Sequence, residues 1–432
     1  MQEQVGCVRS GSDQGSADYD YDIIIVGAGP AGSTCAWFAA QAGLRVALMD
    51  GAVFPRDKVC GDALSRTKVW PLLQEMGVAE SFDELPMVPC RDYLVVAPSG
   101  GQLRVTASRE ENALSGANRI CRRRVFDQRL LEHAASKADV LQAFTVTDVA
   151  RVDGAVEVTG HERATGRQRR LRGAVVVGAD GAQSVVAARA GLRDGSETLP
   201  GIALRGWLRH VEPPRDCLEL YFLAPLLPGY LWIFPSEDGT VNVGVGIFRG
   251  QLARMRVGLD EVFWRLIKGH PVLAERFRDA ALLEPLQGWP LPLWSRRRRL
   301  SADGVLLAGD AAGLVDPLTG EGIGNAMLSG KIAAAVAGEA LRSRDASARF
   351  LRRYDARLWQ MMGREFLLAR LLQRVIARPW AVNAVVRCAR LNGAFARLVH
   401  SVILAPGGKQ DLLSLRGLRR IVGDRHVAGR RI

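Results

Sequence analysis

The chain has 432 residues, of which 48% are hydrophobic and 24% are charged, and its formal net charge is +13. This length supports two domains or one large composite domain with an ample core. Seven cysteines without a CxxC pair, together with only six histidines, argue against a metal site or a disulfide framework and favour the reducing cytosol. The sequence has no apolar run long enough to predict a transmembrane helix.

Arginine supplies most of the positive charge, notably at 295–300 and in the last third of the chain. No nucleic-acid-binding motif accompanies it, so nucleic acid is not an expected partner. Two interpretations remain, a compositional preference for arginine or attraction to anionic lipid head groups. Residues 1–19 are polar and lack the apolar stretch of a signal peptide, so they are predicted to form a disordered tail.

Residues 22–50 predict the first unit of a dinucleotide-binding fold. An apolar strand over 23–26 is followed by a GxGxxG turn, a helix over about 30–42 and a second apolar strand over 46–49. Continuous apolar strands of this kind are typical of a parallel sheet that is buried on both faces.

The residues of this turn have separate physical roles. The first glycine permits a tight turn, the second lets the backbone approach a pyrophosphate, and the third lets the helix pack closely. Free N–H groups at the helix start attract phosphates, and an acid at the end of the second strand can accept from a ribose hydroxyl. The motif alone does not distinguish NAD from FAD. The candidates are Gly27, Gly29, Pro30, Ala31, Gly32 and Asp50.

Two later segments favour FAD. Residues 174–186 contain an apolar strand that ends in an Asp-Gly turn, and residues 304–327 contain another that runs into a glycine-rich loop before a helix over 325–341. An acid at the second strand end can hold a ribityl or ribose hydroxyl, and the helix start can face the electron-rich N1 and O2 edge of a flavin. The candidates are Asp180, Gly181, Gly309, Asp310, Pro317, Gly320, Gly322 and Ile323.

These segments, in this order, resemble the FAD-dependent oxidoreductases of the aromatic-hydroxylase fold over residues 20–345. The stretch RRRVFDQRLLEHA at 122–134 is similar to a helix start in that family, and by position it implies that Arg123 binds the cofactor. No second GxGxxG follows a strand, so no separate NAD(P)H domain is expected. The sequence does not show the electron source, and the expected donor is NAD(P)H or a ferredoxin-type protein.

Two further stretches resemble the geranylgeranyl reductase family, which includes bacterial menaquinone-tail reductases. FPRDKVCGDALS at 54–65 is similar to the K-x-C-G segment of that family, with DALS where the family has GGLS. PGYLWIFP at 228–235, followed by GTVNVGVG, is similar to its aromatic GYxWxFP signature. The WxWxIP stretch of a halogenase fits less well, because Tyr230 and Phe234 stand where it has its first Trp and its Ile.

The resemblance implies a reductase that adds hydrogen across C=C bonds of a polyprenyl chain, with hydride from reduced FAD. That chain would belong to a quinone, a geranylgeranyl lipid or a prenylated metabolite. The alternative function is a monooxygenase or halogenase of the same fold. Because an isolated alkene offers nothing to polarise, the enzyme must mainly align the bond and exclude water.

The same resemblance implies roles for individual residues. Tyr230, Trp232 and Phe234 would line an apolar slot beside the flavin, although any half-buried strand shows alternate aromatics on one face. Tyr221 would add an upstream aromatic, with a spacing about one residue short. Cys60 would lie near the flavin as a proton relay, or as a small buried hydrophobe. The catalytic candidates are Cys60, Tyr230 and Trp232, the substrate-binding candidates are Tyr221, Tyr230, Trp232 and Phe234, and Lys58 and Cys60 join the cofactor-binding candidates.

The predicted fold is α/β, with a Rossmann-like FAD-binding domain, an inserted antiparallel-sheet substrate domain and a helical C-terminal region. The expected segments are 20–88, 108–200 and 290–345 for the first, 89–107 and 201–289 for the second, and 346–432 for the third.

The helical C-terminal region contains two basic amphipathic stretches, at 368–380 and 412–423, and Pro379 interrupts its pattern. These stretches predict either a cap on the substrate domain or helices in a membrane interface. The expected location is the cytoplasm, with peripheral contact at the inner face of the cytoplasmic membrane as the alternative.

Overall fold

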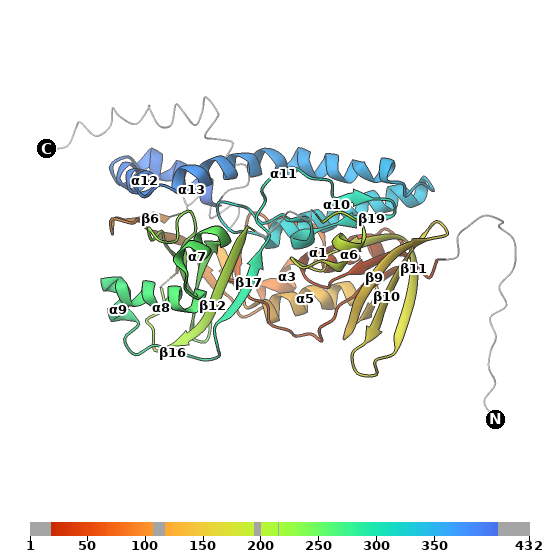
Figure 1. Ribbon diagram of the computed structural model, residues 1–432, viewed down its shortest axis with the longest axis horizontal. Helices are drawn as coiled ribbons and strands as arrows, with labels where there is room; N and C mark the ends of the chain where they lie inside the picture. The colour runs from red at the N-terminus through yellow and green to blue at the C-terminus, as the bar shows by residue number, and fades with distance from the viewer. Residues whose placement is uncertain (1–18, 107–116, 194–199, 215, 405–432) are drawn as a thin grey trace, which may run out of the picture.

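The computed structural model describes residues 19–106, 117–193, 200–214 and 216–404. Two large sheets form the two halves of the molecule, and the long helix α11 (Ala348–Ile376) lies along both (Figure 1). The α/β fold expected from the sequence is confirmed, with a largely parallel first sheet, a largely antiparallel second sheet and C-terminal helices.

The first sheet is the scaffold of the dinucleotide turn. Its strands follow the order β18-β19-β11-β1-β2-β8, and β10 and β9 extend it from β11. The central pairs β1–β2, β1–β11 and β11–β19 are parallel, as buried apolar strands predict. The bounds are β1 Tyr21–Val26, β2 Val46–Met49, β8 Asp139–Leu141, β9 Phe144–Val152, β10 Ala155–Glu162, β11 Gln168–Gly178, β18 Ser301–Ala302 and β19 Val305–Leu307.

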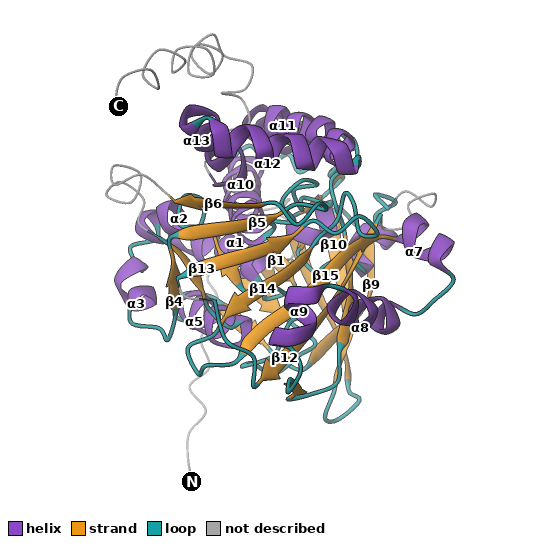
Figure 2. Cartoon of the chain, turned by 90° about the vertical axis from the view of Figure 1, so that its left-hand side faces the viewer, coloured by secondary structure: helices purple, strands orange, loops and turns teal. Residues whose placement is uncertain are grey.

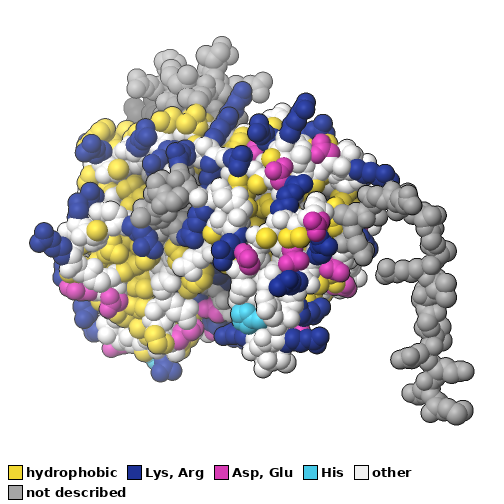
Figure 3. Space-filling view, turned by 45° about the vertical axis from the view of Figure 1, so that its right-hand side comes forward, with side chains coloured by type: hydrophobic (Ala, Val, Ile, Leu, Met, Phe, Trp, Pro, Cys, Tyr) yellow, Lys and Arg dark blue, Asp and Glu magenta, His cyan; other side chains and the backbone are white. Residues whose placement is uncertain are grey.

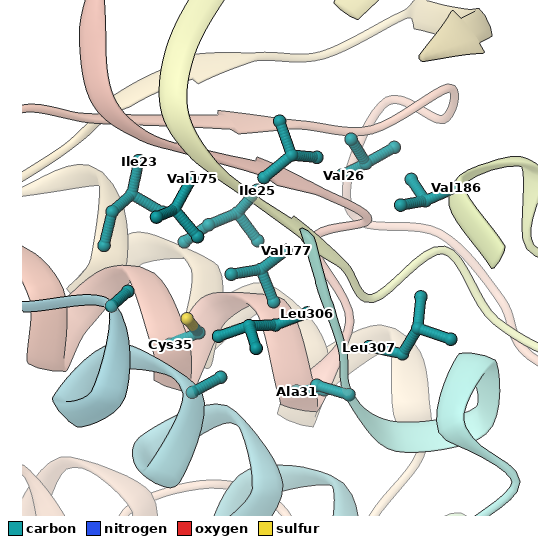
Figure 4. Packing of buried hydrophobic residues seen from close by; sticks show 14 of the residues in the cluster. Ile23, Ile25, Val26, Ala31, Cys35, Val175, Val177, Val186, Leu306 and Leu307 are labelled. Carbon is teal, nitrogen blue, oxygen red and sulfur yellow. The ribbon is translucent and has the colours of Figure 1, made fainter. Parts of the chain in front are cut away.

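Helices cover this sheet and close its core. Ile25, Val177 and Leu306 from three neighbouring strands meet Ala31 and Cys35 of α1 (Figure 4). Small residues let α1 and α10 approach each other closely, since a Cβ at Gly330 would lie 2.2 Å from the carbonyl oxygen of Ala31. The bounds are α1 Pro30–Gln41, α5 Arg123–Ala135, α6 Val185–Arg189, the 3₁₀ turn η1 Gly309–Ala312 and α10 Ile323–Arg342.

The second sheet follows the order β16-β12-β15-β14-β13-β5-β6, with β17 also paired to β12. Its pairs are antiparallel except β13–β5. Its outer face packs on α8 and α9 (Figure 2). The bounds are β5 Asp92–Val96, β6 Gln102–Thr106, β12 Gly201–Arg209, β13 Cys217–Tyr221, β14 Leu231–Pro235, β15 Val241–Phe248, β16 Ala281–Leu282, β17 Gln287–Leu291, α7 Arg249–Met255, α8 Leu259–Gly269 and α9 Pro271–Arg276.

A small third sheet joins the two halves, with the strand order β3-β7-β4. It carries the end of the 54–65 segment, because β3 follows that loop directly. The bounds are β3 Ala63–Leu64, β4 Val88–Cys90, β7 Asn118–Ile120, α2 Trp70–Glu75 and α3 Ala79–Asp83.

The C-terminal region is helical as expected, and Pro379 stands at the first position of α12 (Pro379–Leu391). α12 and α13 (Gly393–Leu404) pack against β6 of the second sheet. No helix in the described ranges is long and apolar enough to cross a membrane. The predicted tail before residue 19 and the second basic stretch at 412–423 lie outside the described residues.

Candidate active site

The dinucleotide turn has the geometry that its glycines predict. Gly27 has φ +100°, and a Cβ there would lie 2.3 Å from the carbonyl oxygen of Ala179. A Cβ at Gly32 would lie 1.7 Å from the carbonyl oxygen of Gly27, so α1 can approach the turn only with glycine at this position. The Asp50 carboxylate accepts a hydrogen bond of 2.8 Å from the Ala28 N–H, which fixes the turn to the end of β2.

A guanidinium that the sequence analysis missed lies beside this turn. Arg56 Nη2 would lie 3.5 Å from a Cβ at Gly29, and it forms a 3.0 Å ion pair with the buried Asp127. The same carboxylate accepts two 2.7 Å hydrogen bonds from Arg123. Arg56 Nη1 is buried with no hydrogen-bond partner among the described residues. A guanidinium with an open N–H group next to a helix N-terminus fits a phosphate.

Asp180 and Asp310, the acids at the ends of the two other strands, differ in their hydrogen-bond partners. Asp180 caps α6, because its carboxylate accepts from Ser184 Oγ at 2.5 Å and from the Val185 N–H at 2.7 Å. Burial raises the pKa of Asp180, against these hydrogen bonds. Asp310, on η1, borders the cavity described below and lies near the start of α10. Both acids border the cavity, but the carboxylate of Asp180 is already bound to its own helix start, so Asp310 is the better candidate to hold a cofactor hydroxyl.

The loop before α10 is held rigidly. The buried Asp316 accepts from the N–H groups of Leu318 and Thr319, at 2.9 and 3.0 Å. Tyr230 Oη donates to the Thr319 carbonyl at 2.5 Å, and Gln373 of α11 donates to the Pro317 carbonyl. The loop therefore connects the aromatic strand to the C-terminal helices.

Lys68 joins three segments at the start of α10. Its ammonium lies 3.0 Å from Glu365 Oε1 on α11, 3.1 Å from Glu321 Oε2 and 3.3 Å from Asn325 Oδ1. The three partners lie more than 250 residues away in sequence, so no local pattern signals this cluster. The two carboxylates outweigh burial and hold the pKa of Lys68 above its usual range.

The predicted residues converge on one cavity of about 870 Å³. All of them border it except Gly32, which packs beneath the turn, and Tyr221. The cavity begins at the dinucleotide turn, passes the loop before α10 and crosses the inner face of the second sheet. Its floor consists of Tyr93, Ala203, Leu218, Leu220, Phe222, Tyr230, Trp232, Phe234, Trp289 and Leu291.

Beyond this floor, the C-terminal helices form an apolar arm of the cavity. Its lining contains Val95, Leu103, Leu372, Ile376, Val382, Val385, Val386, Phe395, Leu398, Val399 and Val402. These side chains come from β5, β6, α11, α12 and α13. The helical C-terminal region is thus part of the cavity wall.

The signature strand β14 separates two environments. Trp232 and Phe234 face the cavity, opposite Gly244 and Asn242 of β15. The Trp232 ring lies over Gly244 of β15, since a Cβ at Gly244 would come within 2.1 Å of the ring. The β15 valines pair instead with Leu231, Ile233 and Pro235 and face α8. The valines of the hairpin therefore do not share the aromatic face.

The structure corrects the expectation for Tyr221. Its side chain faces the outer core, where it donates to Glu219 at 3.1 Å and packs edge-on against His270. Phe222, one residue later, lines the cavity and contacts the Tyr230 ring. Because side chains alternate along a strand, a shift of one residue reverses the face, as the short spacing of Tyr221 indicates.

Lys58 and Cys60 border the cavity between the two sheets. The Lys58 ammonium lies 3.8 Å from the centre of the Trp289 ring. Burial lowers the pKa of Lys58 to about 8, although Asp310 opposes this effect. Burial also raises the pKa of the Cys60 thiol, against the influence of Arg123. Cys60 therefore keeps its proton at neutral pH.

The residues at the dinucleotide turn fit FAD. The turn leaves no room for a side chain at Gly27, the start of α1 and the open Nη1 of Arg56 suit a diphosphate, and Asp310 suits a hydroxyl. The start of α10 faces the same space, where a flavin ring would extend toward the aromatic floor. Fold and site together define a FAD-dependent oxidoreductase.

Comparison with known proteins supports the assignment of a FAD-dependent oxidoreductase. Residues 20–361 match the family described as FAD binding domain. The chain is 32% identical over 358 residues to digeranylgeranylglycerophospholipid reductase 2 of Methanopyrus kandleri, covering 81% of this chain and 85% of that protein. It is 31% identical over 376 residues to menaquinone reductase of Mycobacterium tuberculosis, covering 84% and 86%. The chain thus belongs to the FAD-binding domain family and, within it, to the geranylgeranyl reductase family.

Solved structures share the fold. A geranylgeranyl bacteriochlorophyll reductase-like protein from Thermoplasma acidophilum superposes with a TM-score of 0.75 at 24% identity, covering 94% of this chain and 96% of that one. The myxobacterial chondrochloren halogenase superposes with a TM-score of 0.70 at 22% identity, covering 89% and 90%. Because one fold carries both chemistries, function must be argued from the cavity.

Proposed function

We propose that this enzyme hydrogenates C=C bonds of a polyprenyl chain, carried by a lipid, a quinone or a prenylated metabolite. The observation that carries the proposal is the continuous cavity, which runs from the flavin site over an aromatic floor into an arm lined by aliphatic side chains. A prenyl chain has no hydrogen-bonding groups along its length, so burial in such an arm supplies its binding free energy.

FAD, when reduced, supplies a hydride at N5 of its ring. The chain's own residues align the alkene and keep water away. Trp232 and Phe234 form the floor beneath the reacting bond, and Tyr230 is fixed by its hydrogen bond to the Thr319 carbonyl. The Cys60 thiol borders this compartment and holds a proton at Sγ, which makes it a candidate for protonating the second carbon.

An anaerobic turnover experiment tests this function. The FAD-loaded protein is reduced with dithionite, and menaquinone or a geranylgeranyl lipid in detergent is added. We expect oxidised flavin absorbance to return and a product two mass units heavier. Oxygen or halogen in the product, formed only after air is admitted, would contradict the reductase function. Replacing dithionite by NADPH or by reduced ferredoxin identifies the donor, for which we propose one of these two classes.

Trp232→Ala is expected to reduce turnover of the prenyl substrate strongly and to leave FAD bound, because the ring forms the floor of the cavity. Visible absorbance of the purified variant measures FAD, and mass spectrometry measures product. Trp264→Ala, on helix α8, which packs against the opposite face of the same sheet, is the control. Loss of FAD from the Trp232 variant would place the ring at the cofactor instead.

We also propose that the α11–α12 face contacts an anionic membrane. This face comprises the exposed Leu367, Leu371 and Val375 of α11 and Trp380 of α12, which is 69% exposed. Six arginines and no acidic residue occur between Glu365 and the end of α13. Leu372 and Ile376, beside this face, line the apolar arm, so a chain leaving the bilayer has a short path inward.

On the side of the molecule shown in Figure 3, Lys and Arg are scattered among acidic and apolar side chains. The arginines that follow Glu365 in α11–α12, which have no acidic residue among them in sequence, are the candidates for contact with lipid phosphates.

Liposome co-sedimentation tests the membrane contact. Because each arginine near an anionic surface contributes about 1 kcal/mol, the double variant Arg374→Gln, Arg378→Gln should bind phosphatidylglycerol vesicles roughly thirty-fold more weakly. Leu371→Asp should also weaken binding, and high salt should release the wild type. Val272→Asp, an exposed site on α9, is the matched control. No sedimentation of the wild type at low salt would refute the contact.

A further inference from the structure

Asp62 is a buried carboxyl behind the aromatic floor. Its residue is 2% exposed, and its φ of +63° lies in the left-handed region that favours glycine. Its carbonyl accepts a 3.0 Å hydrogen bond from the Cys121 N–H, which anchors the loop next to the small third sheet. Burial of a carboxyl and a left-handed backbone both cost free energy, so a role for this side chain is expected.

One side chain links Asp62 to the cavity floor. The fully buried Asn242 receives a 2.9 Å hydrogen bond from Trp232 Nε1 at its Oδ1. Its Nδ2 donates to the Cys60 carbonyl at 2.9 Å and to Asp62 Oδ2 at 3.2 Å. An indole N–H only donates and a carbonyl only accepts, so this amide has a single orientation.

The charged and titratable groups around Asp62 come from several elements. Arg205 approaches from β12 and Arg123 from α5, Asp57 and the thiol of Cys60 come from the same loop, and the thiol of Cys121 comes from the segment before α5. Arg205 is fully buried and donates to Asp57 at 2.6 Å, while its Nε and Nη1 have no hydrogen-bond partner in the described part of the chain. Asp62 Oδ1 likewise has no hydrogen-bond partner there. One oxygen is thus committed to Asn242 and the other is open.

This carboxyl titrates in an accessible range. Burial raises the pKa of Asp62 to about 8 and outweighs the lowering effects of Arg205 and Arg123. Below that pH the group is neutral and accepts weakly from Asn242. Above it the group is ionised, and the hydrogen bond from Asn242 is charge-assisted and stronger.

We propose that Asp62 is a positioning residue that fixes the Trp232 indole through Asn242 and tightens this hold when it loses its proton. Asp62 itself does not border the cavity. Its effect on the reaction is indirect and rests on the proposed function, whereas its effect on Trp232 does not.

The indole N–H signal of Trp232 tests the proposal directly. The FAD-loaded protein is labelled with ¹⁵N-tryptophan, and Trp232→Phe identifies the signal among the nine tryptophans. We expect its chemical shift to change between pH 7 and 9 with a midpoint near 8. Asp62→Asn, which keeps an acceptor but cannot ionise, should abolish this titration. Trp70, whose Nε1 donates to Asp83 at 3.1 Å, is the internal reference.

Asp62→Gly removes the acceptor and suits the left-handed backbone, so this variant should fold. Its Trp232 N–H should exchange with solvent roughly five- to ten-fold faster, as the loss of one hydrogen bond predicts. A Trp232 signal that does not titrate in the wild type, or that titrates equally in Asp62→Asn, would overturn the proposal. Unchanged exchange in Asp62→Gly would overturn it as well.

The consequence for ligand binding is measured separately, with geranylgeraniol as the probe and the flavin difference spectrum as the signal. Wild-type affinity should rise roughly five-fold from pH 7 to 9, and Asp62→Asn should show no such rise. If geranylgeraniol does not bind at all while Trp232 titrates as expected, the proposed function fails and the positioning role stands. If it binds equally at both pH values in the wild type, Asp62 does not shape the cavity.

Discussion

Single residues at the flavin site owe their roles to partners distant in sequence. The sequence makes Lys58 a cofactor-binding candidate, but its ammonium lies over the Trp289 ring, and Arg56, two residues earlier, stands at the dinucleotide turn. In an extended loop, residues i and i+2 point the same way, so the FPRDK segment alone does not assign the two cations. The buried Asp127 draws Arg56 toward α5 and so resolves the choice.

The raised pKa of Asp62 predicts that the stability of the protein falls as pH rises. Its pKa is about 8 in the folded protein, against 3.8 for an aspartate in an unstructured chain, so between these values the folded state binds the extra proton. Stability from this group is therefore full below pH 4 and declines as pH rises toward 8.

Asp62→Asn removes that decline. The free energy of unfolding of the variant, relative to that of the wild type, should therefore rise by about 1 kcal/mol per pH unit between pH 5 and 7. Urea unfolding of both proteins across this range provides the measurement. Asp279→Asn, at an exposed acid, should instead parallel the wild type. Parallel curves for the position-62 variant would show that this carboxyl is ionised in the folded protein throughout.

Among the secondary-structure elements, α11 performs two tasks. Its buried face packs on α10 and the first sheet through Leu358 and Phe366, and Leu372 lines the apolar arm. Between them, Glu365 meets Lys68 beside the loop before α10. The helix therefore connects the C-terminal region directly to the loop before α10, which borders the flavin site.

Lys68→Met should destabilise the protein by about 2 to 4 kcal/mol, because it leaves Glu321 and Glu365 without their shared cation in a largely buried place. FAD should also bind more weakly, since Glu321 caps the start of α10 through the Gly324 N–H. Thermal unfolding and FAD titration measure both effects. Lys331→Met, which removes an exposed pair with Glu75, should cost less than about 1 kcal/mol. Equal effects of the two variants would contradict the linking role.

The sequence predicted those parts of the fold and site that depend on local patterns. The strands at 23–26 and 46–49, the first helix and the glycines of the turn follow from spacing and apolar content. Asn242, Asp62 and the Lys68 cluster could not be predicted, because their partners come from distant segments that only the folded chain brings together. The prediction for Tyr221 failed for a second reason: strand alternation assigns its face only once the register is known.

On the scale of the whole molecule, the cavity connects the first sheet, the second sheet and the C-terminal helices. Its first part lies at the carboxyl ends of the parallel strands, where such folds bind cofactors. Its middle crosses the second sheet, and its arm ends among α11, α12 and α13. Under the proposed function, α11, α12 and α13 would set the length of prenyl chain that the enzyme accepts.

Filling the arm should shorten the accepted chain. Leu372→Trp overfills a lining position, so KM for a geranylgeranyl substrate should rise about ten-fold while a farnesyl substrate is affected less. FAD content should not change. Met361→Trp, at an exposed position of the same helix outside the α11–α12 face, is the matched control. Equal effects on both chain lengths would indicate that the substrate does not reach this arm.

The two faces of β14 belong to different parts of the second sheet. Leu231 and Ile233 belong to the outer core with α8, whereas Trp232 and Phe234 belong to a separate inner cluster that borders the cavity. Under the proposed function, mutations on the inner face would therefore alter which chain is accepted without disturbing the outer core. Point mutations on this face could therefore change the substrate during evolution while the protein still folds. A laboratory library confined to positions 232 and 234 of β14 should likewise contain a high proportion of folded variants.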